Sequence, residues 1–253
     1  MNASLPMYDR PELAESHEEY WRNIHVALSN RGIDSPIHLN KQGFGLPFWK
    51  SENLVLSQTC GMPYRKYLLD KVCLVGTPDF GVDGCPPGYY CSHFVVRKND
   101  HRESVADYHG AVFAFNEVDS QSGFAAAWNH LKVDQIWFKQ TLQTGAHLTS
   151  AKAVAFKEAD IASIDAVTWR FAEQYEEFAG QLRILETTTP TPGLPYITSR
   201  QNDPDLIFDA LQEALAVTNP QTLHRLHIRG IQKIPKAEYL NVPNPEISVS
   251  DHQ

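Results

Sequence analysis

Short apolar runs and amphipathic stretches alternate along the whole chain. Runs of strand length predict strands at residues 2–7, 53–57, 71–76, 89–98, 111–115, 160–164 and 182–186. Apolar residues at helical spacing predict helices from Pro11 to Gly32 and at residues 104–108, 147–157, 166–178 and 203–217. This alternation of strands and helices predicts an α/β fold.

Two segments rich in turn-forming residues, 77–88 and 187–193, interrupt this alternation. A middle domain that the chain enters and leaves once predicts two lobes joined by two crossovers. We therefore expect lobe 1 to comprise residues 1–93 and 191–253, and lobe 2 residues 94–190, each a mixed sheet flanked by helices. Such proteins commonly hold a ligand in the cleft between their lobes and close around it by hinge motion. Proline and polar residues from Pro235 onward predict a frayed C-terminal end.

Composition restricts the partners of the chain. The formal net charge is -8 and basic residues form no cluster, which argues against nucleic acid or an anionic membrane as a partner. No apolar run reaches membrane-spanning length, so we expect no direct membrane insertion. Residues 1–10 lack the basic start and apolar core of a secretory signal, which predicts a cytoplasmic protein. A periplasmic location would require that a signal had been removed and replaced by a new Met.

Cysteine and histidine spacing gives no pattern typical of a metal site. Cys60, Cys73, Cys85 and Cys91 form no Cys-x-x-Cys pair, so we expect no structural zinc. Cys73 lies in a predicted strand, whereas the other three lie in or beside loops, where a disulfide is possible but its pairing is left open. His224 and His227 are three residues apart, which favours surface or capping roles over metal binding. We expect no metal and no cofactor.

Residues 111–123 contain the strongest candidate for a ligand site. A strand over 111–115 is followed by a polar turn and by Ser120-Gln-Ser-Gly123, which leads into an apolar helix start. A helix start has unpaired backbone N–H groups and partial positive charge. Hydroxyls placed there, with a glycine that allows close approach, make a neutral cradle for an oxyanion. The alternative is an ordinary serine N-cap, and the two roles are compatible.

Four stretches in register identify a family resemblance. They are Asp83-Gly-Cys-Pro-Pro-Gly-Tyr-Tyr90, Asp119-Ser-Gln-Ser-Gly123, Thr144-Gly-Ala-His147 and Asp160-Ile-Ala-Ser-Ile-Asp165, and together they cover about the middle half of the chain. With them the chain resembles the substrate-binding component of phosphate, phosphite and phosphonate ABC transporters. This resemblance implies the two-lobed periplasmic-binding-protein fold of type 2 and a partner permease.

The resemblance also implies which residues bind the ligand. The phosphonyl group would be held by the Ser-x-Ser-Gly turn, through Ser120, Gln121 and Ser122, and His147 would donate to the same oxyanion. Tyr89 matches a tyrosine that lines the cleft, and Gln58 lies where the first lobe would contact the ligand.

The chain departs from family members that bind aminophosphonates. Those members pair the ligand's ammonium group with carboxylates, but Val167 and Leu194 stand at the corresponding positions here. Asp165 lies nearby and could substitute, or it could cap the helix that follows. A buried amine without a partner costs several kcal/mol, so phosphate, phosphite, an alkylphosphonate or another small oxyanion is favoured over an aminophosphonate.

An enzyme and a sensor are the two alternatives to a solute-binding protein. An enzyme would need a nucleophile and a base, which His147, Asp165 or Cys60 could supply, but no nucleophile elbow or phosphate-binding loop orders them. We therefore expect a binding protein and no catalytic residues. The other alternative is a cytoplasmic sensor that closes on its ligand and contacts a partner.

Overall fold

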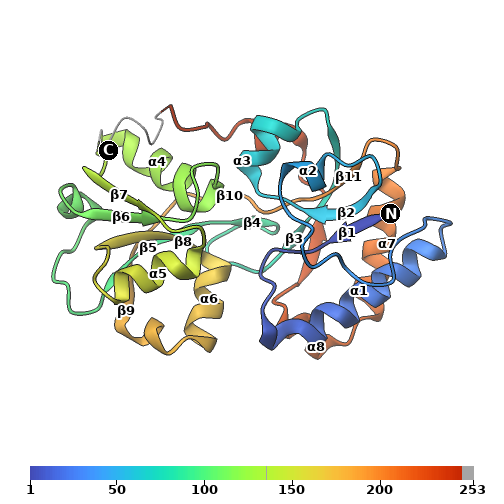
Figure 1. Cartoon of the computed structure of the whole chain (residues 1–253), viewed down its shortest axis with the longest axis horizontal. Coiled ribbons are helices and arrows are strands. Elements are labelled where there is room, and N and C mark those ends of the chain that lie inside the picture. The colour runs from blue at the N-terminus through green and yellow to red at the C-terminus, as the bar shows by residue number, and fades with distance from the viewer. Residues whose placement is uncertain (135, 247–253) are drawn as a thin grey trace. The chain divides into compact units, whose positions relative to one another are not determined.

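The computed structural model describes residues 1–134 and 136–246 and divides the chain into two compact units (Figure 1). The first unit consists of Met1–Tyr89 and Pro192–Leu240, and the second of Tyr90–Thr191 and residues 241–246. Residues 90–93, 191 and 241–246, which the sequence placed in lobe 1, thus group with the second unit. The predicted frayed end falls on residues 247–253, outside the described residues.

The first unit is built on a mixed five-stranded sheet in the order β1-β2-β11-β3-β12. Only β1 and β2 are parallel, and the other neighbours pair antiparallel. The strands are β1 (Asn2–Ser4), β2 (Leu54–Gln58), β3 (Val72–Asp79), β11 (Tyr196–Ser199) and β12 (Gly230–Gln232). Its helices are α1 (Ala14–Ser29), α2 (Leu46–Trp49), α3 (Gly61–Pro63), α7 (Pro204–Val217), α8 (Pro220–Arg225) and α9 (Lys236–Leu240).

The two long helices of the first unit, α1 and α7, follow their sequence signals. In α1 the apolar residues at helical spacing, from Tyr20 to Leu28, are buried. Gly32 then adopts a positive φ of 71° and ends the helical stretch, a conformation that glycine reaches without strain. In α7 the carboxylate of Asp203 accepts hydrogen bonds from the first-turn N–H groups of Asp205 and Leu206, and Pro204 occupies the first helical position.

The edge strand β1 is covered by a single residue of the following loop. The backbone N–H of Asn40 donates to the Ala3 carbonyl at 2.7 Å, and the Asn40 Oδ1 atom accepts from the Ala3 N–H at 3.0 Å. These two bonds pair the backbone N–H and C=O groups of Ala3 on the side of β1 where no further strand lies.

The second unit has a five-stranded sheet in the order β7-β6-β8-β5-β9. Strands β6, β7 and β8 run parallel, and β5 is antiparallel to both of its neighbours. The strands are β5 (Ser92–Arg97), β6 (Val112–Phe115), β7 (Gln140–Gln143), β8 (Ile161–Asp165) and β9 (Leu182–Thr187). The helices are α4 (Ala126–Leu131), α5 (His147–Ala155) and α6 (Ala166–Tyr175), and a π-helical turn, η4 (Gln121–Ala125), precedes α4.

Two buried clusters cover this second sheet. One is mostly aliphatic, with Val154 and Ile164 among its members, and also includes the indole of Trp169. The other is aromatic and centres on Phe113, whose ring stacks on Phe138 with centroids 4.5 Å apart. Strand side chains alternate between the two faces, so β6 and β8 are buried on both sides, whereas the edge strand β7 is not.

The boundaries between the units lie in two short strands, β4 (Tyr89–Tyr90) and β10 (Thr191–Pro192), which pair with each other. The strand predicted over 89–98 is therefore broken at Cys91, and the predicted connector 187–193 contains β10. Gly193 donates its N–H to the Gly88 carbonyl at 2.9 Å, and a Cβ atom at Gly193 would lie 2.7 Å from that oxygen. Glycine is needed here for the close approach of the two segments.

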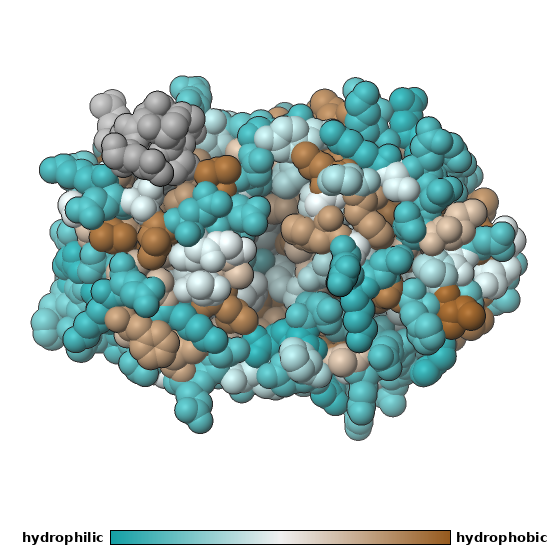
Figure 2. Space-filling model, in the orientation of Figure 1, coloured by the Kyte–Doolittle hydropathy of each residue, from teal (hydrophilic) through white to brown (hydrophobic). Residues whose placement is uncertain are grey.

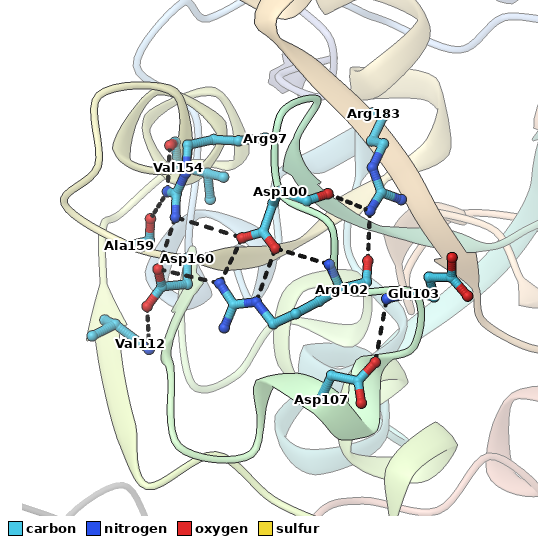
Figure 3. Close-up of polar contacts among 10 residues, drawn as sticks. All are labelled: Arg97, Asp100, Arg102, Glu103, Asp107, Val112, Val154, Ala159, Asp160 and Arg183. Atoms are coloured by element: carbon cyan, nitrogen blue, oxygen red, sulfur yellow. Dashed lines mark hydrogen bonds and ion pairs between the residues drawn. The ribbon is translucent and has the colours of Figure 1, made fainter.

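Arginine and aspartate side chains form a network of ion pairs and hydrogen bonds next to the start of β8 (Figure 3). Arg97 pairs with Asp160 at 2.8 Å and donates to the carbonyls of Val154 and Ala159. Arg102 bonds both carboxylate oxygens of Asp100, at 2.9 and 2.6 Å. These hydrogen bonds hold the pKa of Asp100 well below its usual range.

The face in Figure 2 is covered mainly by hydrophilic residues, with apolar ones scattered among them. Among the described residues, no helix is both long enough and apolar enough to span a bilayer. All four cysteines are thiols. Within the same residues, no group of three or more His, Cys, Asp or Glu side chains is arranged to hold a metal ion.

Candidate functional site

Three helical segments of the second unit start at the same edge of its sheet. Strands β7, β6 and β8 are parallel neighbours, and each is followed by a helical segment that begins at His147, Gln121 and Ala166 respectively. Parallel neighbouring strands have their carboxyl ends on the same side of the sheet. The three helix starts therefore lie together at the carboxyl ends of β7, β6 and β8. The structure thus brings the predicted site residues of the second unit, Ser120, Gln121, Ser122, His147 and Asp165, to one end of the sheet.

Ser120 caps the π-helical turn η4. Its Oγ atom accepts a hydrogen bond from the Gly123 N–H at 3.0 Å, and its carbonyl accepts from the Ala125 N–H at 3.0 Å. The capping role, which the sequence offered as one alternative, is therefore present. Ser120 and Gln121 are both buried, and a π-turn at a helix start is a common feature of functional sites.

Gly123 allows the turn to lie against Asn116. A Cβ atom on Gly123 would lie 1.9 Å from the Asn116 Oδ1 atom, so a larger residue requires a shift of this side chain. The Asn116 carbonyl accepts from the Gly145 N–H at 2.9 Å, which links the loop after β6 to the loop before α5. Asn116 was not predicted as a site residue, although it lies in the same motif.

Ser122 and His147 connect two of the helix starts. The Ser122 Oγ atom lies 2.8 Å from the His147 Nε2 atom, within hydrogen-bond distance. The Ser122 carbonyl accepts from the Ser163 hydroxyl of β8 at 2.8 Å. Ser122 is thus held from two sides, by α5 and by β8. The role of Ser163 was not predicted because it depends on the packing of η4 against β8.

The electrostatics favour a neutral His147. Burial lowers the pKa of His147, and the negative charge of Asp165 opposes this effect. Burial likewise lowers the pKa of His93 on β5, where Asp165 again opposes it. A neutral imidazole has one donor and one acceptor nitrogen, so His147 can donate from Nε2 toward Ser122 and leave the serine hydroxyl proton for a ligand.

Asp165 is the N-cap of α6. Its Oδ1 atom accepts hydrogen bonds from the Val167 N–H at 2.7 Å and the Thr168 N–H at 3.0 Å. Its side chain is buried, and its negative charge is balanced in part by the start of the helix. The capping alternative for Asp165 is present here, and ligand contact by Asp165 stays a prediction.

The two predicted site residues of the first unit have partners within that unit. The Gln58 Nε2 atom donates to the Leu194 carbonyl at 3.1 Å. The Tyr89 hydroxyl donates to Glu238 at 3.2 Å, and burial together with this carboxylate raises the pKa of Tyr89. Ligand contact by Gln58 and Tyr89 stays a prediction. Val167 and Leu194 are buried apolar side chains.

Comparison with known proteins identifies the family. A family model described as "ABC transporter, phosphonate, periplasmic substrate-binding protein" matches residues 75–239. The chain therefore belongs to this family, whose members are solute-binding components of ABC transport and not its catalytic subunits. No curated protein sequence matches the chain significantly.

Solved structures of low sequence identity share the fold. PhnD1 from Prochlorococcus marinus, in complex with methylphosphonate, has a TM-score of 0.70 at 13% identity, covering 96% of this chain and 95% of that one. A binding protein component of an ABC phosphonate transporter from Pseudomonas aeruginosa has a TM-score of 0.69 at 16% identity, covering 96% and 83%. A Xanthomonas citri protein bound to chloride ion has a TM-score of 0.69 at 14% identity, covering 96% and 95%. The two-lobed periplasmic-binding-protein fold predicted from the sequence is confirmed.

Proposed function

We propose that this protein binds a small phosphorus oxyanion, namely phosphate, phosphite or an alkylphosphonate, at the helix starts of its second unit. The observation that carries the proposal is the contact of Ser122 with a neutral His147 where three helix starts gather. Family membership supports the ligand class, as does the methylphosphonate complex of the similar Prochlorococcus protein.

The proposed chemistry relies on neutral donors. Backbone N–H groups at a helix start and a serine hydroxyl can donate to the oxygens of a tetrahedral anion, and the neutral imidazole of His147 supports this by donating its single N–H to the Ser122 oxygen. Such donors suit a chain whose formal net charge is -8, because attraction by the overall field is unfavourable for an anion. We assign Ser120 a double role, in which its side chain caps η4 and so fixes the N–H groups that face the ligand.

We further propose that the protein works with an ABC permease in the periplasm. The family description names a periplasmic component, and its members act with a membrane partner. A binding protein of this kind delivers its ligand unchanged, so ligand recovered from the complex should be chemically intact.

Thermal unfolding tests the ligand class. Phosphate, phosphite and methylphosphonate are titrated separately, with sulfate as the matched non-phosphorus oxyanion. A ligand that binds only the folded state raises the unfolding midpoint with the logarithm of its concentration. We expect a saturable rise for at least one phosphorus oxyanion and none for sulfate. A flat response to all three phosphorus compounds would contradict the proposal.

A further inference from the structure

The first unit contains a pocket of about 470 Å³ that shares no residue with the site described above. Its lining comes from one face of α1, from the chain segment 37–41 and from Leu5, Pro6 and Asp9, which follow the edge strand β1. Residues of α1 that recur at helical spacing form one wall: Ala14, His17, Glu18, Trp21, Arg22 and His25. A volume of roughly 300–1,000 Å³ is typical of small-molecule sites.

Hydrogen bonds hold the opposite wall in place. The Trp21 Nε1 atom donates to the carbonyls of Pro36 and Ile37, both at 3.2 Å, and His25 Nδ1 lies 2.7 Å from the Ser35 Oγ atom. Beyond these residues, Asn40 is bonded to β1. The segment is therefore fixed to α1 and to the sheet on either side of the pocket, which makes the pocket a built feature of the unit.

The lining combines apolar and aromatic groups with one buried imidazole. Leu5, Pro6 and Leu39 contribute apolar surface beside the indole of Trp21. Both ring nitrogens of His17 are buried. Burial lowers the pKa of His17, and the negative charge of Asp9 opposes this effect. A neutral imidazole has one donor and one acceptor nitrogen, which suits the polar groups of a ligand.

Charged side chains of both signs line the same pocket without neutralising one another. Arg22 and Lys41 contribute positive charge, and Asp9 and Glu18 negative charge. In the part of the chain that the structure describes, no ion pair involves any of these four side chains. The nearby carboxylate of Glu19 accepts hydrogen bonds from Thr222 and Asn219, and these bonds together with the positive charge of Arg22 lower its pKa.

From this arrangement we propose that the pocket binds a zwitterionic amino acid with an aromatic side chain. The ring packs against Trp21 and the apolar residues, the carboxylate pairs with Arg22 and Lys41, and the ammonium group pairs with Asp9 and Glu18. A purely anionic or cationic ligand would satisfy only one pair of charges. An amino acid without a ring would leave the apolar surface uncovered.

Isothermal titration calorimetry with four probes tests this assignment. L-phenylalanine carries ring, carboxylate and ammonium groups, and 3-phenylpropionate, phenethylamine and L-alanine each lack one of them. We expect saturable one-to-one binding of L-phenylalanine that is at least about tenfold tighter than that of the other probes. Binding of 3-phenylpropionate or phenethylamine as tight as that of L-phenylalanine overturns the proposal, as does no saturable binding of L-phenylalanine up to about 10 mM.

Point variants test whether L-phenylalanine binds in this pocket. Arg22→Gln should weaken L-phenylalanine binding by at least about tenfold and leave phenethylamine binding unchanged. Glu18→Gln should weaken L-phenylalanine and leave 3-phenylpropionate unchanged. Lys50→Gln removes an exposed lysine that does not line the pocket, and it should change nothing. Equal effects of Lys50→Gln and Arg22→Gln on L-phenylalanine binding overturn the assignment.

A pocket-filling variant gives an independent test. Ala14→Phe places a ring inside the pocket and should abolish L-phenylalanine binding, while binding of phosphorus oxyanions stays as in the wild type. Circular dichroism checks that the variant is folded, and if it is not, the charge variants decide. Retained L-phenylalanine binding in folded Ala14→Phe contradicts the proposal.

Discussion

The Ser122 hydroxyl oxygen lies 2.8 Å from the Nε2 atom of His147. The two residues are far apart in sequence, yet each stands at the start of a helical segment that follows a strand of the same parallel set. The contact therefore joins the donor groups of two helix starts. It orients the serine hydroxyl and fixes which nitrogen of the imidazole faces it.

Asp165 partly offsets the effect of burial on the pKa of His147. Its negative charge opposes the lowering of the His147 pKa by burial, so its removal takes away an effect that raises the pKa. We predict that Asp165→Asn lowers the pKa of His147 further, while asparagine retains the cap of α6. Titration of the imidazole by NMR measures this shift. An unchanged or raised pKa in the variant would show that the carboxylate does not act on His147.

Gly123 should tolerate no side chain while Asn116 is present. Gly123→Ala places a Cβ atom against the Asn116 Oδ1 atom, and strain of this kind typically costs about 1–3 kcal/mol. We predict a loss of that size in the free energy of unfolding, measured in urea. The double variant Gly123→Ala with Asn116→Ala should recover much of it, because the clashing atoms are gone. Additive losses in the double variant would place the strain elsewhere.

We expect the ligand site to select against phosphonates that carry an ammonium group. Val167 and Leu194, the positions at which the family resemblance implies carboxylates in aminophosphonate binders, are buried and apolar. An ammonium group without a partner costs several kcal/mol when buried. We therefore predict that methylphosphonate binds at least about tenfold more tightly than 2-aminoethylphosphonate. Competition titrations measure the ratio, and preference for the amine would indicate that Asp165 or another carboxylate pairs with it.

The ion-pair network of the second unit should contribute stability that depends on pH. Because the folded-state pKa of Asp100 is lowered, its contribution is complete above the unfolded value of about 4 and is lost as pH falls toward the folded value. We predict that Asp100→Asn lowers the free energy of unfolding at pH 7, and that its difference from the wild type shrinks by pH 3. Asp134→Asn, at an exposed aspartate of the same unit, serves as the control and should show neither effect. A difference that stays constant with pH would contradict this account of Asp100.

Strong periodicity and clear caps made most elements predictable. α1, α5 and α7 form within a few residues of the predicted bounds because their buried faces repeat at helical spacing. β7 was missed because its sequence, Gln-Thr-Leu-Gln, is polar and it lies at a sheet edge, where only pairing with β6 makes it a strand. β11 was missed because a buried strand of four residues has too little pattern to distinguish it from a loop.

The candidate site could likewise be predicted only in part from the sequence. The family resemblance implied that Ser122, His147 and Asp165 lie near one ligand, but the sequence pattern alone did not, because β7, the strand before His147, was missed. The roles of Asn116, Ser163 and His93 depend on which side chains and backbone atoms the packing of distant segments brings together. No local pattern records such contacts between distant segments. The pocket beside α1 was missed for the same reason, since its second wall is an irregular segment.

Calorimetric titration of methylphosphonate into Ser122→Ala tests the central claim most directly. Ser104→Ala, which removes a capping serine at Val105–Tyr108 in the same unit, is the matched control. We predict that Ser122→Ala weakens binding by about 1.5–3 kcal/mol, the range for a charge-assisted hydrogen bond, and that Ser104→Ala binds as the wild type does. Wild-type affinity in folded Ser122→Ala would contradict the assignment of this site.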